Sequence, residues 1–243
     1  MTTASPCLRG VLFDKDGTLI DFHQTWMPVY RRAVAAVAGI AGYPALEGKL
    51  LEAAGYDVRS GRCLPSSPLA AGTVEEIARV WARESGVSRR ILMDELSAIF
   101  DAEAPARAVP VRDLRLVLKR LKDRGLLLGV ATMDSMASAA STLSRIGIDH
   151  QFDFICGYDS GHGQKPGRGM VDAFCAHVRL RPAEIVLVGD TLHDLDMGRA
   201  AAVGRVVGVL TGSSTRAQLA PHCDAVISGI AELEPLLDRW GLR

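Results

Sequence analysis

The chain has 243 residues, and its 28 lysines and arginines balance its 28 aspartates and glutamates. Proteins that neutralise nucleic-acid phosphates or coat anionic membranes usually carry a basic excess, which is absent here. We therefore expect a small-molecule partner, no nucleic acid and no membrane, and we leave the oligomeric state open. A hydrophobic content of 48% excludes a disordered chain, and the length corresponds to one or two domains.

No part of the sequence resembles a membrane span or a signal peptide. Apolar runs stay well short of the roughly 20 residues that cross a bilayer, and residues 1–10 have neither a basic region nor an apolar core. We therefore expect a cytoplasmic protein. The cysteines are odd in number, widely spaced and without a C-x-x-C pair, so we expect reduced thiols rather than disulfides or a zinc site. They are Cys7, Cys63, Cys156, Cys175 and Cys223.

The first predicted element is a buried strand over residues 8–13, a short apolar run that ends at an acidic loop. The long segment that follows has the apolar spacing of helices. Thr73 and Glu76 have capping-box spacing there, and Ser88 is expected to cap a helix that reaches Phe100. Few strands are expected in this segment.

After Pro110 the chain alternates helical segments with short apolar runs, which favours a parallel sheet with crossover helices. The predicted strands are residues 126–132, 152–156, 185–189, 206–210 and 225–227. The predicted fold is therefore α/β, with a Rossmann-like parallel-sheet core and an inserted helical cap domain. Residues 1–20 and 109–243 form the predicted core, and residues 21–108 form the predicted cap.

Chemically active side chains follow several of the predicted strands. In an open parallel sheet, ligands bind beyond the carboxyl ends of the strands, so these side chains are expected to meet in one place. They are Asp14, Asp16, Thr132, Met133, Asp134, Lys165, Asp190 and Asp194.

Such a pocket has the groups that phosphoryl transfer requires. Asp14 can act as a nucleophile while Asp16 exchanges a proton with the leaving group. Around one lysine, four of these carboxylates sum to about minus three if all ionise: Asp14, Asp16, Asp190 and Asp194. This charge calls for a hard cation, and magnesium prefers carboxylate and phosphate oxygens. The Thr132 hydroxyl and Lys165 suit the oxygens of a phosphoryl group.

Four motifs occur in order along the chain. Residues 14–21 read DKDGTLID, Thr132 follows a predicted strand, Lys165 precedes Pro166, and residues 189–194 read GDTLHD. Together they resemble the haloacid dehalogenase superfamily, and within it the phosphoglycolate-phosphatase-like branch with a helical C1-type cap. The resemblance covers nearly the whole chain outside the details of the cap.

The resemblance implies an aspartyl-phosphate mechanism with bound magnesium. Asp14 would attack phosphorus, and Asp16 would protonate the leaving alcohol and then activate water. The metal would be held by the Asp14 carboxylate, the Asp16 backbone carbonyl and Asp190, with Asp194 in support. The phosphoryl group would be bound by Thr132, the backbone amide of Met133 and Lys165.

We therefore expect a magnesium-dependent phosphomonoester hydrolase of a small phosphorylated metabolite, with phosphoglycolate as the first candidate. A dehalogenase is disfavoured because it has no use for an acid at Asp16. A phosphomutase of the β-phosphoglucomutase type stays open, although Thr18 favours hydrolysis slightly. A non-catalytic binding or regulatory protein is the remaining alternative, but the nucleophile and the metal ligands are all present.

An acid so soon after the second motif departs from the family pattern. We expect Asp134 to cap the helix predicted over residues 135–146, which would direct its charge away from phosphate. Trp26 and Tyr30, four residues apart, are expected to pack in the core of the cap or at its boundary.

Several basic side chains near the predicted site have no assigned role. Loop histidines are more often solvated than catalytic, whereas arginines in a cap loop could bind a substrate carboxylate. These residues are His162, His193, Arg59 and Arg62.

Overall fold

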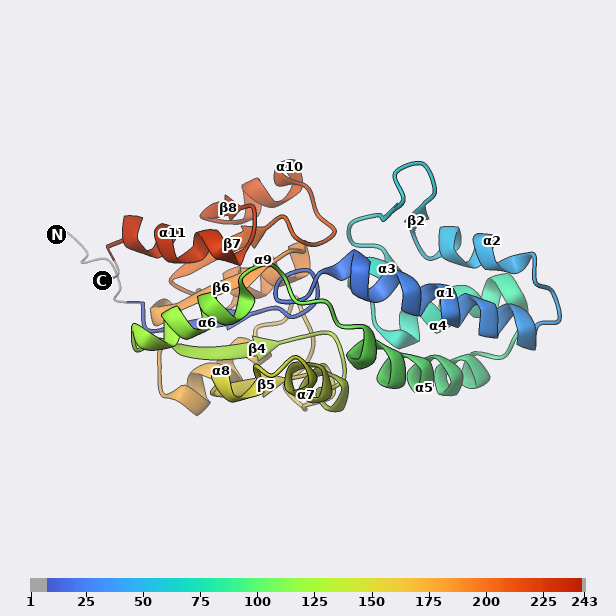
Figure 1. Ribbon diagram of the computed structural model, residues 1–243, viewed down its shortest axis with the longest axis horizontal. Helices are drawn as coiled ribbons and strands as arrows, with labels where there is room; N and C mark the ends of the chain where they lie inside the picture. Colours follow the sequence, from blue (N-terminus) through green and yellow to red (C-terminus); the bar gives the residue numbers. More distant parts are fainter. Residues whose placement is uncertain (1–7, 242–243) are drawn as a thin grey trace.

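The molecule has two adjacent parts, a parallel sheet covered by helices and a bundle of helices beside it (Figure 1). The computed structural model describes residues 8–241. Within them the main sheet has six parallel strands in the order β5-β4-β1-β6-β7-β8. The strands are β1 (Gly10–Phe13), β4 (Leu127–Ala131), β5 (Phe154–Cys156), β6 (Ile185–Gly189), β7 (Arg205–Val209) and β8 (Ala225–Ile227). Each lies where the sequence predicts a strand, and the predicted α/β fold class is confirmed.

Helices cover both faces of this sheet. They are α6 (Leu114–Asp123), α7 (Met136–Arg145), α8 (Gly169–Val178), α9 (Leu192–Ala200), α10 (Arg216–Leu219) and α11 (Leu233–Arg239). Successive side chains of a strand point to opposite faces. Val11 and Phe13 therefore share a core with α6, α7 and α11, whereas Leu12 packs with α8 and α9 on the other face. Both faces are apolar, which explains why the central strands are continuous hydrophobic runs.

Short 3-10 turns complete the connections of the sheet. They lie at Asp149–Gln151, Pro182–Glu184, Ala220–His222 and Ile230–Glu232.

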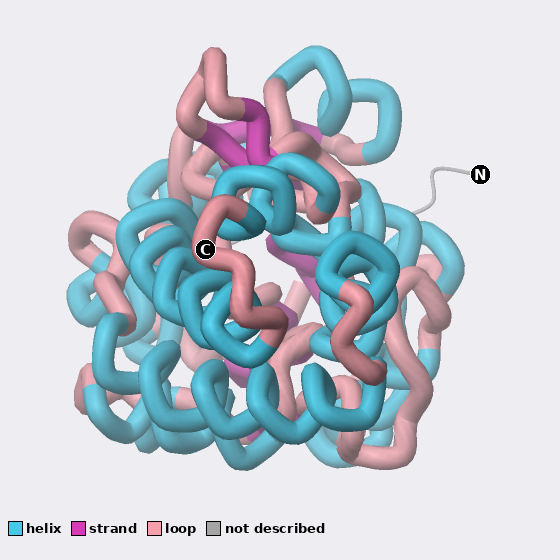
Figure 2. The backbone as a smooth tube through the Cα atoms, turned by 90° about the vertical axis from the view of Figure 1, so that its right-hand side faces the viewer, coloured by secondary structure: helices cyan, strands magenta, loops and turns pink. Residues whose placement is uncertain are grey.

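The helical bundle has a hydrophobic core of its own. Its helices are α1 (Phe22–Ile40), α2 (Leu46–Ala53), α3 (Pro68–Ala71), α4 (Val74–Ser85) and α5 (Arg89–Arg107). Trp81 lies at the centre and is fully buried, and its indole nitrogen donates to the carbonyl oxygen of Leu50 at 2.7 Å. Seen from the bundle end, these helices form most of the face nearest the viewer (Figure 2). The division into a core and a cap at residues 20–21 and 108–109 stays a prediction.

The start signals predicted for two helices of the bundle are confirmed. Thr73 and Glu76 form a capping box at the start of α4, and the Ser88 hydroxyl accepts from the Ile91 amide at the start of α5. The helix that begins after Ser88 does not end at Phe100. It runs to Arg107 because its apolar face continues beyond Phe100. A hairpin of β2 (Tyr56–Asp57) and β3 (Arg62–Cys63) was not expected, since two-residue strands leave no sequence pattern.

Two neighbouring chain segments join the bundle to the sheet. The amide of Asp21 donates to the carbonyl oxygen of Val109 at 2.8 Å, and the amide of Val111 donates to that of Leu19 at 3.0 Å. The first segment leads directly out of the loop that follows β1. The bundle is therefore attached at the carboxyl end of the central strand.

The thiols of the described cysteines are free. Cys63, Cys156 and Cys175 are buried and Cys223 is partly exposed, whereas Cys7 lies outside the described residues. Among residues 8–241, no helix is both long and apolar enough to cross a membrane.

Candidate active site

The order of the strands changes direction at β1. From β1 the chain goes outward to β4 and β5, and then returns to the other side of β1 for β6, β7 and β8. In open α/β sheets, ligands bind at such a switch point, beyond the carboxyl ends of the strands. Asp14 follows β1, Thr132 follows β4 and Asp190 lies directly after β6. The structure therefore brings three of the predicted site residues to one edge of the sheet.

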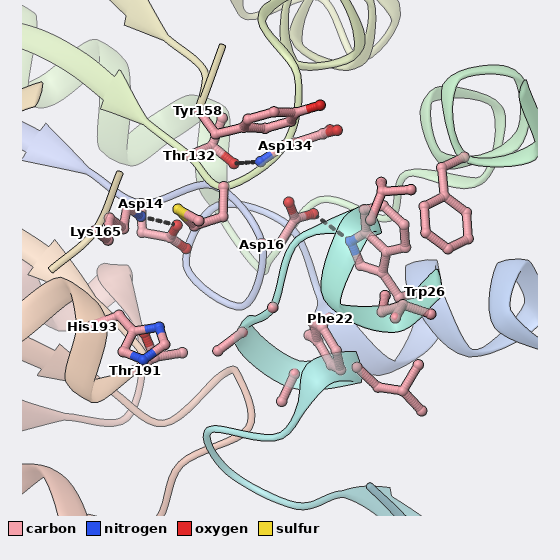
Figure 3. A pocket seen from close by; sticks show the side chains of 18 of the residues that line it. Asp14, Asp16, Phe22, Trp26, Thr132, Asp134, Tyr158, Lys165, Thr191 and His193 are labelled. Carbon is pink, nitrogen blue, oxygen red and sulfur yellow. Dashed lines mark hydrogen bonds and ion pairs between the residues drawn. The ribbon is translucent and has the colours of Figure 1, made fainter. Parts of the chain in front are cut away.

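Lys165 lies at the centre of the acidic group and binds two of its members. Its ammonium contacts Asp14 Oδ1 at 2.6 Å and Asp194 Oδ1 at 2.5 Å (Figure 3 shows the contact with Asp14). The other oxygen of Asp194 accepts from the amide of Thr191 at 3.0 Å and from its hydroxyl at 2.6 Å. Both Asp194 oxygens are thus occupied, and this residue positions Lys165.

Burial controls the protonation of these groups. It raises the pKa of Asp14 to about 7, against the opposing effect of Lys165. Burial also raises the pKa of Asp190 well above its ordinary value, with Asp14 adding to the effect. For Lys165, burial disfavours the charged form, but Asp14 and Asp194 outweigh it and hold its pKa above the usual range. One cation does not neutralise the carboxylates that surround it.

The acidic cluster fits a divalent cation. Carboxylate oxygens of Asp14, Asp190 and Asp194 lie within 4.8 Å of one another. Two buried oxygens, Asp14 Oδ2 and Asp190 Oδ1, have no hydrogen-bond partner. Unpartnered buried carboxylate oxygens are costly, and hard cations prefer oxygen ligands of this kind. Asp14 and Asp190 are therefore the carboxylates with oxygens available for a metal.

The backbone holds Asp190 firmly in place. Its Oδ2 accepts from the amide of Ser213 at 2.9 Å. Gly17 lies against the carboxylate, with φ of +90°, and a Cβ at that position would come within 2.6 Å of Asp190 Cγ. A glycine is required there both for the left-handed backbone and for the close approach. The glycine of the first motif thus positions a carboxylate of the fourth.

Asp16 is directed away from the acidic cluster and toward the bundle. Its Oδ1 accepts from the indole nitrogen of Trp26 at 2.7 Å, and its Oδ2 pairs with Lys15 at 2.7 Å (Figure 3 shows the contact with Trp26). The Asp16 carboxylate does not belong to the cluster of Asp14 and its neighbours. Any bond from Asp16 to a metal would therefore use its backbone carbonyl, as the family resemblance implies.

Lys15 is a second buried cation that the sequence analysis missed. It is 1% exposed and pairs with both Asp16 and Asp134, the latter at 3.1 Å. Burial disfavours its charge, but the two carboxylates outweigh this and raise its pKa. One sequence signal could have indicated this ion pair: the first motif contains a lysine, Lys15, and an unexpected acid, Asp134, follows the second motif.

The expectation that Asp134 caps a helix was wrong. The N-cap of α7 is Ser135, whose hydroxyl accepts from the amide of Ser138 at 3.1 Å. Asp134 instead pairs with Lys15 and accepts from the Ser135 amide at 2.8 Å. Burial raises the pKa of Asp134, and Lys15 opposes that shift. A buried ion pair, rather than a helix terminus, therefore accommodates this charge.

The second motif offers a hydroxyl and a side chain to the same cavity. Thr132 is buried, and its Oγ1 accepts from the amide of Asp134 at 3.1 Å, which leaves the hydroxyl hydrogen free to donate (Figure 3). Thr132 and Met133 line the cavity together with Asp14, Asp16 and the other predicted site residues.

The bundle lines one side of the cavity with an aromatic wall. Trp26 stacks on Tyr30 with ring centroids 5.4 Å apart, and Phe100 packs edge-on against Trp26 at 5.5 Å. The expected packing role of Trp26 and Tyr30 is confirmed by their burial. Both also line the cavity, which the helical spacing alone did not indicate.

The basic residues without an assigned role lie in different places. His193 lines the cavity, and His162 is exposed and does not line it. Arg62, in the bundle, donates to the carbonyl oxygen of Gly212 at 3.0 Å, and this hydrogen bond connects the bundle to the part of the chain that contains the sheet. Neither Arg62 nor Arg59 lines the cavity, so the expectation that they bind a substrate carboxylate is not supported.

The comparisons with known proteins agree with this geometry. A family model described as haloacid dehalogenase-like hydrolase matches residues 8–202. The phosphoglycolate phosphatase of Yersinia pestis is 27% identical over 95% of this chain and 93% of its own length. A predicted phosphoglycolate phosphatase from Haemophilus somnus 129PT superposes with a TM-score of 0.75 at 18% identity, over 95% of this chain and 98% of its own.

Another solved structure with a similar fold is named as a different enzyme. The putative β-phosphoglucomutase of Thermotoga maritima superposes with a TM-score of 0.69 at 18% identity, over 96% of this chain and 99% of its own. The two structural similarities show the fold. The family match shows that the chain belongs to the haloacid dehalogenase-like hydrolase family. The relatives named phosphoglycolate phosphatase agree with the branch that the motifs of the chain resemble.

Replacing Lys15 tests the buried ion pairs. We expect Lys15→Met to lower the free energy of unfolding by about 2–4 kcal/mol, because it leaves the partly buried Asp16 and Asp134 without their cation. Chemical denaturation measures the change. Adding Asp134→Asn should restore part of the loss, since one of the two stranded charges is then removed. A double variant no more stable than Lys15→Met would contradict this account.

Arg62 and Arg59 provide a matched pair for testing the contact between bundle and sheet. Arg62→Ala removes the hydrogen bond to Gly212 and should lower kcat/KM by roughly two- to tenfold, since one hydrogen bond of a charged donor is lost. Arg59 lies in the same turn and is exposed, so Arg59→Ala should leave kcat/KM unchanged. Equal effects of the two substitutions would show that the Gly212 contact is unimportant.

Proposed function

We propose that the protein is a magnesium-dependent phosphomonoester hydrolase of a small metabolite that works through an aspartyl phosphate. One observation carries the proposal. A buried carboxylate, Asp14, is held by Lys165 through one oxygen and has a second, unpartnered oxygen facing the same cavity as Asp16 and Thr132. A fixed nucleophile with a separate acid nearby is the arrangement that covalent phosphoryl transfer requires.

In the first half of the proposed reaction, a carboxylate oxygen of Asp14 attacks phosphorus. A bond forms between this oxygen and phosphorus, and the bond to the leaving alcohol oxygen breaks. Asp16 gives its proton to that oxygen. The contacts with Trp26 and Lys15 fix the Asp16 carboxyl group on the bundle side of the cavity, where a leaving group would lie.

In the second half, Asp16 takes a proton from water, and the water oxygen attacks the phosphorus of the aspartyl phosphate. The bond between phosphorus and the Asp14 oxygen then breaks, which releases phosphate and restores the carboxylate. Throughout, the Thr132 hydroxyl, the Met133 amide and Lys165 would hold the phosphoryl oxygens. Asp194 would act through Lys165, because both of its oxygens are already engaged.

Magnesium is the cation that we assign to the acidic cluster. Asp14, Asp190 and the backbone carbonyl of Asp16 would hold it, in agreement with the unpartnered oxygens of the two aspartates. When bound, it would supply positive charge for both the carboxylates and the phosphate oxygens. We also propose that residues 21–108 act as a cap that closes the cavity over substrate.

Replacing the nucleophile tests the reaction. With magnesium, the wild-type protein should release phosphate from p-nitrophenyl phosphate, and Asp14→Asn should lower kcat by about a thousandfold or more, because the covalent route is lost. Asp123→Asn is the control, since Asp123 is exposed and pairs with Lys119 on α6.

The same assay separates the alternatives. Absence of phosphate release from the wild-type protein, or equal release by Asp14→Asn, would contradict the proposal. Transfer of the phosphoryl group to an added sugar phosphate in place of water would indicate a phosphomutase. Absence of both reactions would indicate a non-catalytic protein.

The raised pKa values predict how magnesium affects stability. In the metal-free protein the pKa of Asp14 is raised to about 7, and that of Asp190 is raised well above its ordinary value of 3.8. The contribution of these two carboxyl groups to stability is therefore fully present below pH 3.8. The contribution of Asp14 is lost as the pH rises through about 7, and that of Asp190 is lost as the pH rises through the raised pKa of its own carboxyl group. Magnesium binds the ionised form, so it should stabilise the protein more at pH 8 than at pH 6.

Thermal unfolding measures this difference. Magnesium is used at one fixed concentration, a hundred times its dissociation constant at pH 8. It should raise Tm by roughly 5–10 °C at pH 8, and by less at pH 6, where it binds more weakly. Sodium chloride at matched ionic strength is the control. Asp190→Asn should greatly reduce the shift. A magnesium shift of the same size at both pH values, or one that persists in Asp190→Asn, would argue against a metal site at these carboxylates.

A further inference from the structure

The cavity has two chemically different ends. At the sheet edge it is lined by the carboxylates, Lys165 and Thr132, which the proposed function uses for the phosphoryl group. Toward the bundle its lining is almost entirely apolar. The bundle residues of the lining are Phe22, Trp26, Tyr30, Leu69, Ala70, Ala71, Gly72, Val74, Ile77, Ser97, Phe100 and Asp101. With phosphorus at Asp14, the leaving group of a substrate must lie against this apolar end.

The aromatic part of this wall is already packed. Tyr30 donates its hydroxyl to the carbonyl oxygen of Leu69 at 2.7 Å, and Trp26 donates its indole N–H to Asp16. Their polar atoms are therefore used within the protein. The ring edges and faces left to the cavity, with the edge-packed Phe100, present hydrocarbon to a ligand. Burying an apolar group of a ligand against such a surface is favourable, because it removes apolar area from water.

Among the described lining residues, no lysine or arginine lies at the apolar end. Lys15, 5.9 Å from the ring centroid of Trp26, does not line the cavity and is paired with Asp16 and Asp134. Among the described residues that line the cavity, Lys165 is the one lysine or arginine, and Asp14 and Asp194 occupy its ammonium. The other basic lining residue, His193, lies beside Thr191, across the pocket from Trp26 (Figure 3).

One exposed acidic residue of the bundle lines the cavity. Asp101, on α5, is open to solvent and accepts a hydrogen bond of 3.3 Å from the hydroxyl of Ser135. A carboxylate on the leaving group would lose water, meet apolar side chains and approach this like charge. Burial of an anion without a partner is strongly unfavourable.

The nearby start of α4 does not offer an anion site. Gly72 and Val74 line the cavity there, but the helix start is closed by the capping box of Thr73 and Glu76. Glu75 adds a second acid to the first turn. These carboxylates already compensate the positive end of the helix dipole. A leaving-group carboxylate would meet negative charge here as well.

From these observations we infer that the enzyme selects phosphomonoesters of uncharged, apolar or aromatic alcohols and discriminates against esters whose leaving group carries a carboxylate. The inference rests on the proposed phosphatase function and names the substrate class for the same cavity. The aromatic wall and Leu69 bind the leaving group, and Asp101 excludes an anion. Phosphoglycolate, the first candidate from the sequence, is then a poor substrate.

Three esters of primary alcohols test the inference with the wild-type protein and magnesium. Benzyl phosphate has an apolar aromatic leaving group, phosphoglycolate has a carboxylate, and 2-phosphoglycolamide is the uncharged analogue of phosphoglycolate. We expect kcat/KM for benzyl phosphate to exceed that for phosphoglycolate by about tenfold or more, the scale on which hydrophobic pockets discriminate. The amide should exceed the carboxylate several-fold. Phosphoglycolate equal to or better than both would overturn the inference.

A charge reversal at Asp101 tests the excluding residue. Asp101→Arg should raise the ratio of kcat/KM for phosphoglycolate to that for benzyl phosphate by about fivefold or more, because attraction replaces repulsion. Asp94→Arg makes the same change at an exposed position of α5 that does not line the cavity, and should leave the ratio unchanged. An unchanged ratio in Asp101→Arg, or equal changes in both variants, would show that Asp101 does not exclude anions.

Hydrolysis of p-nitrophenyl phosphate separates this inference from the proposed function. Absence of any phosphatase activity in the wild-type protein would contradict the proposed function itself. Good activity toward p-nitrophenyl phosphate, with phosphoglycolate preferred over benzyl phosphate, would contradict the substrate class alone. Circular dichroism of both arginine variants checks that they are folded, and Asp94→Arg, which lies outside the cavity, should retain activity toward this ester.

Discussion

The ion pairs of Lys165 with Asp14 and Asp194 are the interaction on which the rest of the structure depends. The two buried central strands β1 and β6 end in acidic residues at the same edge of the sheet, and burial alone disfavours the charged forms of Asp14 and Asp190. One buried lysine keeps Asp14 fixed while leaving one of its oxygens without a partner. The remaining negative charge is what makes the pocket a cation and phosphate site.

Lys15 repeats this arrangement on the other side of the first motif. It balances Asp16 and Asp134, just as Lys165 balances Asp14 and Asp194. The two acids of the motif are therefore held by different cations and face different directions. That separation suits the two roles proposed for them, because a nucleophile must lie against phosphorus and a proton donor against the leaving group.

The helical bundle contributes more than a cover to the site. Trp26 binds Asp16 from α1 and also forms part of the apolar wall, so the same side chain links the proposed acid to the surface that contacts a leaving group. Arg62 connects the bundle to the loop that contains Gly212, next to the residue whose amide holds Asp190. The bundle therefore contacts the elements that position two of the acids.

Local patterns in the sequence determined the strands of the main sheet, the capping box of α4 and the four motifs, because each depends on neighbouring residues or on burial of a whole strand. The placement of Asp14, Thr132 and Asp190 also followed, since parallel strands carry their ends to one edge. Only the tertiary structure decided the partners of Lys15, Asp134 and Trp26, and the absence of Arg59 and Arg62 from the described lining of the cavity. These contacts join residues far apart in the chain, and which charges meet depends on how the bundle packs against the sheet.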